Sequence, residues 1–146
     1  MTSRLAAVLL ALTLSGPAVA QDWSFLGPLT QQTLDVRPGD GAPMLFSDDP
    51  DPSRAQTALI FHYFGNRDGG NAVHLNIGLY RQTADGWSYA GPVQELFGFD
   101  PREVRFEPGA IAVTTTMQGP DDPRCCPTKV THWRVDPATR QVTRLD

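Results

Sequence analysis

One stretch of strict alternation between apolar and polar side chains constrains the fold of this chain more than any other feature. Between residues 72 and 82 one side carries Val73, Leu75, Ile77 and Leu79, and the other carries His74, Asn76, Gly78 and Tyr80. A period of two predicts a half-buried β-strand. Residues 57–64 form a β-branched and aromatic run that is apolar on both faces, which predicts a central strand. The glycine-containing loop between the two runs predicts a hairpin.

The rest of the chain repeats this pattern in shorter pieces separated by Gly and Pro turns. We expect strands at 87–89, 102–107, 110–117, 129–135 and 141–145, with Trp87 and Tyr89 exposed. Residues 93–99 fit either a single helical turn or a packed loop, in which Leu96, Phe97 and Phe99 form an apolar lid. No segment after residue 20 shows the sustained helical periodicity that a confident helix needs. The sequence therefore predicts a mainly β single small domain with little helix: a curled antiparallel meander of about six strands, small barrel or sandwich-like.

Residues 21–56 have a different composition, rich in Gly and Pro, and predict a turn-rich N-terminal strap in front of a β domain at 57–146. Within the strap we expect one short strand near Gln32 to Val36, with Trp23 and Phe25 as anchors. The acidic run at 48–51 fits either a cation site or a solvated loop. The solvated loop is favoured because a calcium loop needs spaced ligands and a turn glycine.

The first 20 residues read as a secretory signal peptide. Arg4 precedes a short apolar run from Leu5 to Leu12, and Ala18-Val19-Ala20 supplies a cleavage site near Ala20. The predicted location is therefore periplasmic or secreted, and no later segment is apolar enough to predict a membrane span. Removal of the signal peptide with Arg4 changes the formal net charge from -4 to -5, and Lys129 is the only lysine. Nucleic-acid binding is not predicted, because the sequence has no cluster of basic residues.

The only two cysteines, Cys125 and Cys126, are adjacent in the loop 121–128. Neighbouring Cα atoms lie about 3.8 Å apart, below the roughly 4.4 to 6.8 Å that disulfides prefer, so a bond between them closes a tight ring. Such a ring constrains few unfolded conformations, and its effect is local, on a turn already restricted by Pro123 and Pro127. Three interpretations stay open: a structural vicinal disulfide, a reducible redox or soft-metal dithiol, and intermolecular pairing.

Other chemistry has weaker support in the sequence. If the two predicted hairpin strands pair about Asp68, His62 and His74 fall roughly opposite on one face and become weak candidates for metal ligands. A zinc site would need further donors, of which His132 and the cysteines are the obvious ones. A Gly-x-Ser-x-Gly nucleophile motif does not occur. We therefore predict no catalytic residue, no cofactor and no committed metal site.

A resemblance attaches to the cysteine loop and its surroundings. Asp122-Pro123-Arg124-Cys125-Cys126-Pro127-Thr128, followed by Thr131-His132-Trp133-Arg134, resembles a D-P-x-C-C-P-(S/T) and aromatic-Arg signature in uncharacterised exported bacterial proteins, similar to lipoproteins of the LppP/LprE type. Segments 63–73 and 109–113 resemble these proteins in order and spacing. This chain has no lipobox cysteine, so the resemblance does not imply a lipid anchor. The resemblance also implies no established activity and assigns no catalytic residue.

These observations favour a non-enzymatic exported protein. We expect it to bind an envelope protein or a small ligand through a β surface and the loop residues Asp122, Pro123, Arg124, Cys125, Cys126 and Pro127. The alternative is a periplasmic thiol redox or soft-metal-binding protein that uses Cys125 and Cys126. The sequence does not predict an oligomeric state.

Overall fold

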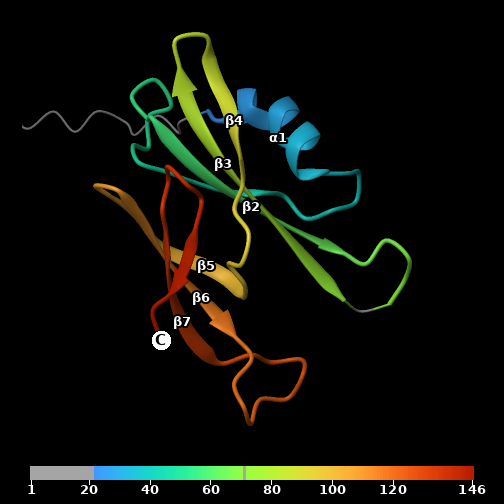
Figure 1. The fold of residues 1–146 in the computed structure, drawn as a ribbon. Helices are drawn as coiled ribbons and strands as arrows, with labels where there is room; N and C mark the ends of the chain where they lie inside the picture. The colour runs from blue at the N-terminus through green and yellow to red at the C-terminus, as the bar shows by residue number, and fades with distance from the viewer. Residues whose placement is uncertain (1–21, 71) are drawn as a thin grey trace, which may run out of the picture.

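A computed structural model describes residues 22–70 and 72–146 of the chain. The predicted signal peptide lies outside the described residues. A short 3-10 helix and one α-helix precede eight strands, which form two four-stranded antiparallel sheets (Figure 1). The elements are η1 (Ser24–Leu26), α1 (Gly27–Leu34), β1 (Met44–Ser47), β2 (Thr57–Gly65), β3 (Val73–Thr83), β4 (Gly86–Pro92), β5 (Phe99–Glu107), β6 (Ala110–Met117), β7 (Lys129–Val135) and β8 (Val142–Arg144).

The first sheet has the order β1-β2-β3-β4, and its two central strands form the predicted hairpin. β2 is buried on both faces, as its two-sided apolar pattern predicted: Leu59 and Phe61 pack on one side, Ala58 and Ile60 on the other. The alternation of β3 is also confirmed. Ile77 and Leu79 lie on the same face of the sheet as Leu59 and Phe61, whereas Tyr80 lies on the opposite face with Ala58 and Ile60.

The second sheet has the order β5-β6-β7-β8, again following the chain. Its regular part is the β6–β7 pair, in register from Ile111 opposite Val135 to Met117 opposite Lys129. β5 pairs irregularly with β6, with register shifts on both sides of Arg102. Bulges of this kind bend a strand and increase its twist.

The two open sheets share one apolar core, so the molecule is sandwich-like and not a closed barrel. Both sheets and the connection between them contribute to this core, whose buried members are Leu59, Phe61, Ile77, Leu79, Val93, Leu96, Ile111, Val113, Trp133 and Val135. The mainly β prediction is confirmed, with eight strands in place of about six. The predicted lid is confirmed for Leu96, whereas Phe97 and Phe99 are exposed.

A second core cluster lies between the first sheet and α1, which packs beside β3 and β4 (Figure 1). Leu26 and Leu34 from the helical segment meet Ile60 and Tyr80 from the sheet. The expectation that Trp87 and Tyr89 are exposed is wrong: both are half-buried here. Trp87 lies edge-on to Trp23, with ring centroids 5.4 Å apart. Trp23 is thus an anchor, as predicted, while Phe25 is exposed.

The predicted strand near residues 32–36 is wrong, because α1 occupies Gly27–Leu34. Pro28 stands at the start of this helix, where its missing N–H costs nothing and its fixed φ favours helical geometry. The helix has only two turns, too few for its periodicity to be seen in the sequence. β1 was missed because its four residues lie between Pro and Asp clusters. Among the described helices, none is long and apolar enough to cross a membrane.

Candidate functional site

The cysteine loop connects the regular β6–β7 pair and projects from the end of the second sheet (Figure 1). Cys125 and Cys126 form a disulfide bond with each other, which confirms the predicted vicinal pair. Pro123, Arg124 and both cysteines are exposed, and Pro127 is half-buried. None of these residues belongs to either core cluster.

Asp122 fixes the base of this loop. Its Oδ2 accepts hydrogen bonds from the backbone N–H of Gly119 at 2.7 Å and of Thr128 at 2.6 Å, and its Oδ1 accepts the Thr128 hydroxyl at 2.7 Å. The hydrogen bonds from Gly119 and then Thr128 hold the pKa of Asp122 below its usual range, since they favour the charged carboxylate. One side chain therefore joins the two ends of the loop.

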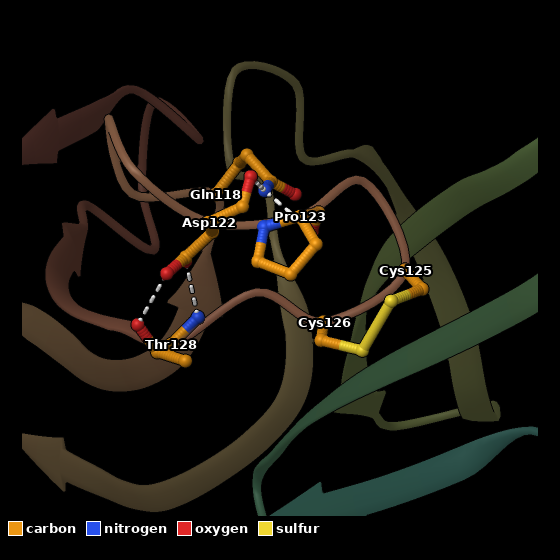
Figure 2. The surroundings of a disulfide bond; sticks show 6 residues. All are labelled: Gln118, Asp122, Pro123, Cys125, Cys126 and Thr128. Carbon is orange, nitrogen blue, oxygen red and sulfur yellow. Dashed lines mark hydrogen bonds between the residues drawn. A yellow bond between two sulfur atoms is a disulfide. The ribbon is translucent and has the colours of Figure 1, made fainter.

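Three further hydrogen bonds order the arm that carries the cysteines. Gln118 Nε2 donates to the carbonyl oxygens of Asp122 at 2.8 Å and Pro123 at 2.9 Å, and Cys126 N donates to Pro123 O at 2.9 Å. Figure 2 shows the hydrogen bonds of Gln118 and Asp122 on one side of the loop and the disulfide on the other. The sulfur atoms thus lie on exposed residues of a loop that is held from its base.

This arrangement allows two kinds of chemistry. A rigid exposed loop can present the disulfide and Arg124 to a partner with little loss of conformational entropy on binding. The exposed disulfide can also accept an attacking thiolate, which would form a mixed disulfide with one cysteine and release the other as a thiolate. Because the pair joins adjacent residues, it ties no two elements of the fold together.

The predicted placement of His62 opposite His74 is wrong in register, although the two side chains do share a face. His62 lies opposite Asn76, and His74 lies opposite Phe64. The Phe64 ring stacks between the two imidazoles, with centroids 5.4 Å from His62 and 5.3 Å from His74. An aromatic ring in this position separates the two candidate ligands.

His62 is instead part of a polar cluster that attaches the end of α1 to the hairpin. It is fully buried, with Nδ1 3.3 Å from Leu34 O and Nε2 3.5 Å from Asp40 Oδ2. Arg67 lies over the Phe64 ring at 4.7 Å and within 3.2 Å of Asp40. Asp40 accepts the backbone N–H of Arg37, and this bond together with the charge of Arg67 lowers its pKa. The sequence did not reveal this cluster, because it joins residues that are far apart in the chain.

The third histidine lies on the outer face of the second sheet, in a row with a threonine and a glutamate. Thr114 Oγ1 donates to Glu103 Oε2 at 2.9 Å and lies 3.3 Å from His132 Nδ1. In a nucleophilic triad the histidine stands between hydroxyl and carboxylate, whereas here the hydroxyl stands in the middle. The row is a cross-strand polar contact.

The acidic run before β2 uses its carboxylates within its own loop. Asp49 pairs with Arg54 at 2.8 Å, Asp51 accepts from Ser53, and Asp48 Oδ1 accepts the backbone N–H groups of Gln56 and Thr57. Across residues 22–70 and 72–146, no three His, Cys, Asp or Glu side chains gather as a metal site. Comparison of the chain with protein-family models, with curated proteins and with solved structures found no match.

Proposed function

We propose that this protein is an exported, non-enzymatic binding protein whose Cys125–Cys126 loop contacts an envelope protein or a small ligand. The observation that carries the proposal is that the loop is ordered without the disulfide. Asp122 fixes the base of the loop by hydrogen bonds, while the two cysteines lie outside both core clusters. Because this disulfide connects no two elements of the fold, it constrains only the conformation of the exposed loop. Fixing that surface in advance lowers the entropic cost of binding.

Export is part of the proposal and rests on the sequence of residues 1–20. A disulfide between exposed cysteines persists in oxidising compartments and is rare in reducing ones, which supports export independently of the N-terminal pattern. Mass spectrometry of the protein recovered from periplasm or culture fluid should give a chain beginning at Gln21 that is lighter by two hydrogen atoms than its dithiol form. A full-length chain confined to the cytosol would contradict export.

Site-specific photo-crosslinking in cells tests the binding role. A photoreactive residue at position 124 should give a discrete adduct, and the adduct should be lost in the Cys125→Ser/Cys126→Ser background. The same residue at position 107, an exposed site at the β5–β6 turn, is the control and should give no such adduct. Identical adducts at both positions, or none at 124, would contradict a contact through the loop.

Thiol exchange is the second candidate, and the exposure of both cysteines favours it. Equilibration of the purified protein with glutathione buffers measures the reduction potential of the pair. A value below about -300 mV, typical of inert structural disulfides, would exclude this function.

The reduced pair would also offer two soft thiolates to Cu(I) or zinc. Stoichiometric metal on the reduced protein, absent from the double serine variant, would support that role.

A further inference from the structure

β3 extends past the end of β4 and leaves part of its edge without a neighbouring strand. The β3–β4 register ends at Gly78 opposite Pro92, whereas β3 itself begins at Val73. A cavity of about 570 Å³ lies along this free edge, between β3 and the residues 92–99. Figure 1 shows this segment leaving β4 and running to β5 in the second sheet.

Backbone groups of alternate residues face the free edge. Val93 N donates to Ile77 O at 2.9 Å, so the carbonyl of Ile77 points away from β2. Along a strand of an antiparallel pair, residues that bond to the partner alternate with residues whose N–H and C=O point the other way. Leu75 and Val73 therefore also point away from β2, and no hydrogen bond within the described residues engages their backbone groups there.

The facing wall carries apolar side chains at its surface. Phe97 and Phe99 are 55% and 45% exposed, and Val73 on the strand side is 53% exposed. All three line the cavity. Large apolar side chains gathered around unpaired backbone groups are unusual for a free surface, because an exposed strand edge invites pairing with another chain.

This wall is held in place by the core. Thr115 Oγ1 donates to Phe97 O at 2.8 Å and accepts the indole N–H of Trp133 at 2.7 Å. Tyr63 Oη donates to Gly98 O at 2.8 Å, and its ring stacks on Phe99 with centroids 5.9 Å apart. The groove is thus formed before any partner arrives, which favours binding.

We propose that this groove binds an extended segment of another polypeptide, which adds a strand to the free edge of β3. The partner supplies backbone N–H and C=O groups to Val73 and Leu75, as a continuation of the ladder that β4 leaves at Pro92. Successive side chains of a strand point to opposite faces. Every second side chain of the bound segment therefore reaches Phe97 and Phe99, and these positions select apolar residues. The repeating backbone donors and acceptors distinguish a peptide from a small apolar ligand.

The groove does not depend on the function proposed for the cysteine loop, because it shares no residue with loop 118–128. The test uses the mature protein and an immobilised library of short random peptides as the probe. We expect enriched sequences with apolar residues at alternate positions. Their binding should slow hydrogen exchange at the amides of Val73 and Leu75.

Three variants separate the contributions. Val73→Ser and Phe97→Ser remove exposed side chains, and each should weaken the enriched peptides by about tenfold or more. Val130→Ser is the matched control, a valine 47% exposed on β7, and should leave affinity unchanged. Val73→Pro removes a donor that faces the groove at the first residue of a strand, where proline is tolerated. It should weaken binding more than Val73→Ser does.

Other outcomes would overturn the proposal. No enriched sequence, equal loss in Val73→Ser and Val130→Ser, or full affinity in both Phe97→Ser and Val73→Pro would each exclude strand addition at this edge. Sedimentation of the mature protein provides a separate check. A dimer broken by Val73→Pro would assign the edge to a second copy of this chain and not to a peptide.

Discussion

Asp122 shows how a single carboxylate can order a loop. The disulfide in the same loop joins only two neighbouring residues and cannot connect the two ends of the loop. The sequence singled out Asp122 through its place in the resemblance, without indicating what its side chain does. Its three short hydrogen bonds reach Gly119 and Thr128, on either side of the loop. Contacts of this kind depend on the path of the loop, which no local pattern specifies.

Replacement of Asp122 by Ala should open the base of the loop without affecting the sheets. Asp121→Ala is the control, because the described structure gives the Asp121 side chain no hydrogen bond. Hydrogen exchange at the amides of Gly119 and Thr128 should become several-fold faster in the first variant and stay unchanged in the second. Equal exchange in the two variants would show that the prolines order the loop.

The same contacts predict a response to acid. The pKa of Asp122 is lowered in the folded protein, so its stabilising effect is present above the ordinary pKa of 3.8 and is lost as the pH falls through the lower folded value. The amide NMR signal of Thr128 should shift at acid pH in the wild type. No corresponding shift should occur in Asp122→Ala.

Tyr63 predicts a response at the alkaline end. Burial, with the charge of Asp100, raises its pKa from 10.0 to about 12. The folded state therefore favours the neutral phenol: its stabilising effect is complete below about pH 10 and is lost as the pH rises to about 12. Tyr63→Phe should flatten the fall of the urea midpoint over this range. It should do so only in part, because burial also raises the pKa of Tyr80 and Tyr89. An unchanged slope would contradict the role of Tyr63.

Among the elements, the connection from β4 to β5 is the one whose shape the sequence predicted least. The apolar lid was expected, yet nothing local showed that Leu96 turns inward while Phe97 and Phe99 stay exposed. Gly98 lies between the two exposed phenylalanines and packs closely against β6. Its φ is 106°, and a Cβ there would lie 2.6 Å from Thr115 Oγ1.

Gly98→Ala should therefore destabilise the protein by roughly 1 to 3 kcal/mol or more, through backbone strain and overpacking together. Gly109→Ala is a matched control: Gly109 also has a positive φ, of 73°, but a Cβ there would have no neighbouring atom within 4 Å. It should cost less, because only the backbone strain applies. Urea midpoints of the two variants compare them directly, and equal losses would remove the packing contribution.

Strands were predicted well where alternation is long, and poorly where an element is short. β3 and β6 were recognised because the residues of one face recur at every second position in the sequence: Val73, Leu75, Ile77 and Leu79 in β3, and Ile111, Val113, Thr115 and Met117 in β6. β1 and α1 are too short to show a period, and their positions depend on packing against β2 and β3. Tertiary contacts decide such elements.

At the scale of the whole molecule, stability should come from the core between the sheets and not from the disulfide. Ile77 is buried in that core, so Ile77→Ala should cost roughly 2 to 5 kcal/mol. Cys125→Ser/Cys126→Ser should cost much less than the roughly 2 to 5 kcal/mol of an ordinary disulfide, since the ring closes no chain beyond the pair. Urea unfolding decides the order. A double serine variant less stable than Ile77→Ala would make the pair a determinant of the fold.

The shared core also predicts that the two sheets unfold together. Trp133 reports on the core between the sheets, whereas Trp87 reports on the cluster beneath α1. Two variants each retain one of these tryptophans, with the other tryptophans replaced by Phe. In each variant, the unfolding transition followed by tryptophan fluorescence should coincide with the transition followed by circular dichroism. Fluorescence and circular dichroism transitions that separate within one variant would show independent sheets.

The assignment of strands to two sheets could not be predicted from the sequence. Every connection between consecutive strands is compatible with one continuous meander. Only the observed strand pairing shows that β4 and β5 belong to different sheets. The break coincides with Gly91 and Pro92, but turns with similar residues elsewhere join paired strands. The choice depends on which faces meet in the core.

The order of the strands along the chain has a consequence for synthesis. All strands of the first sheet have been synthesised once Pro92 is added, whereas β6 and β7, which cover its apolar face, are synthesised later. Leu59, Phe61, Ile77 and Leu79 then form a nascent surface with no cover. Such a half-made chain is prone to aggregate. Holding it unfolded until the last strand has emerged would be the task of a chaperone.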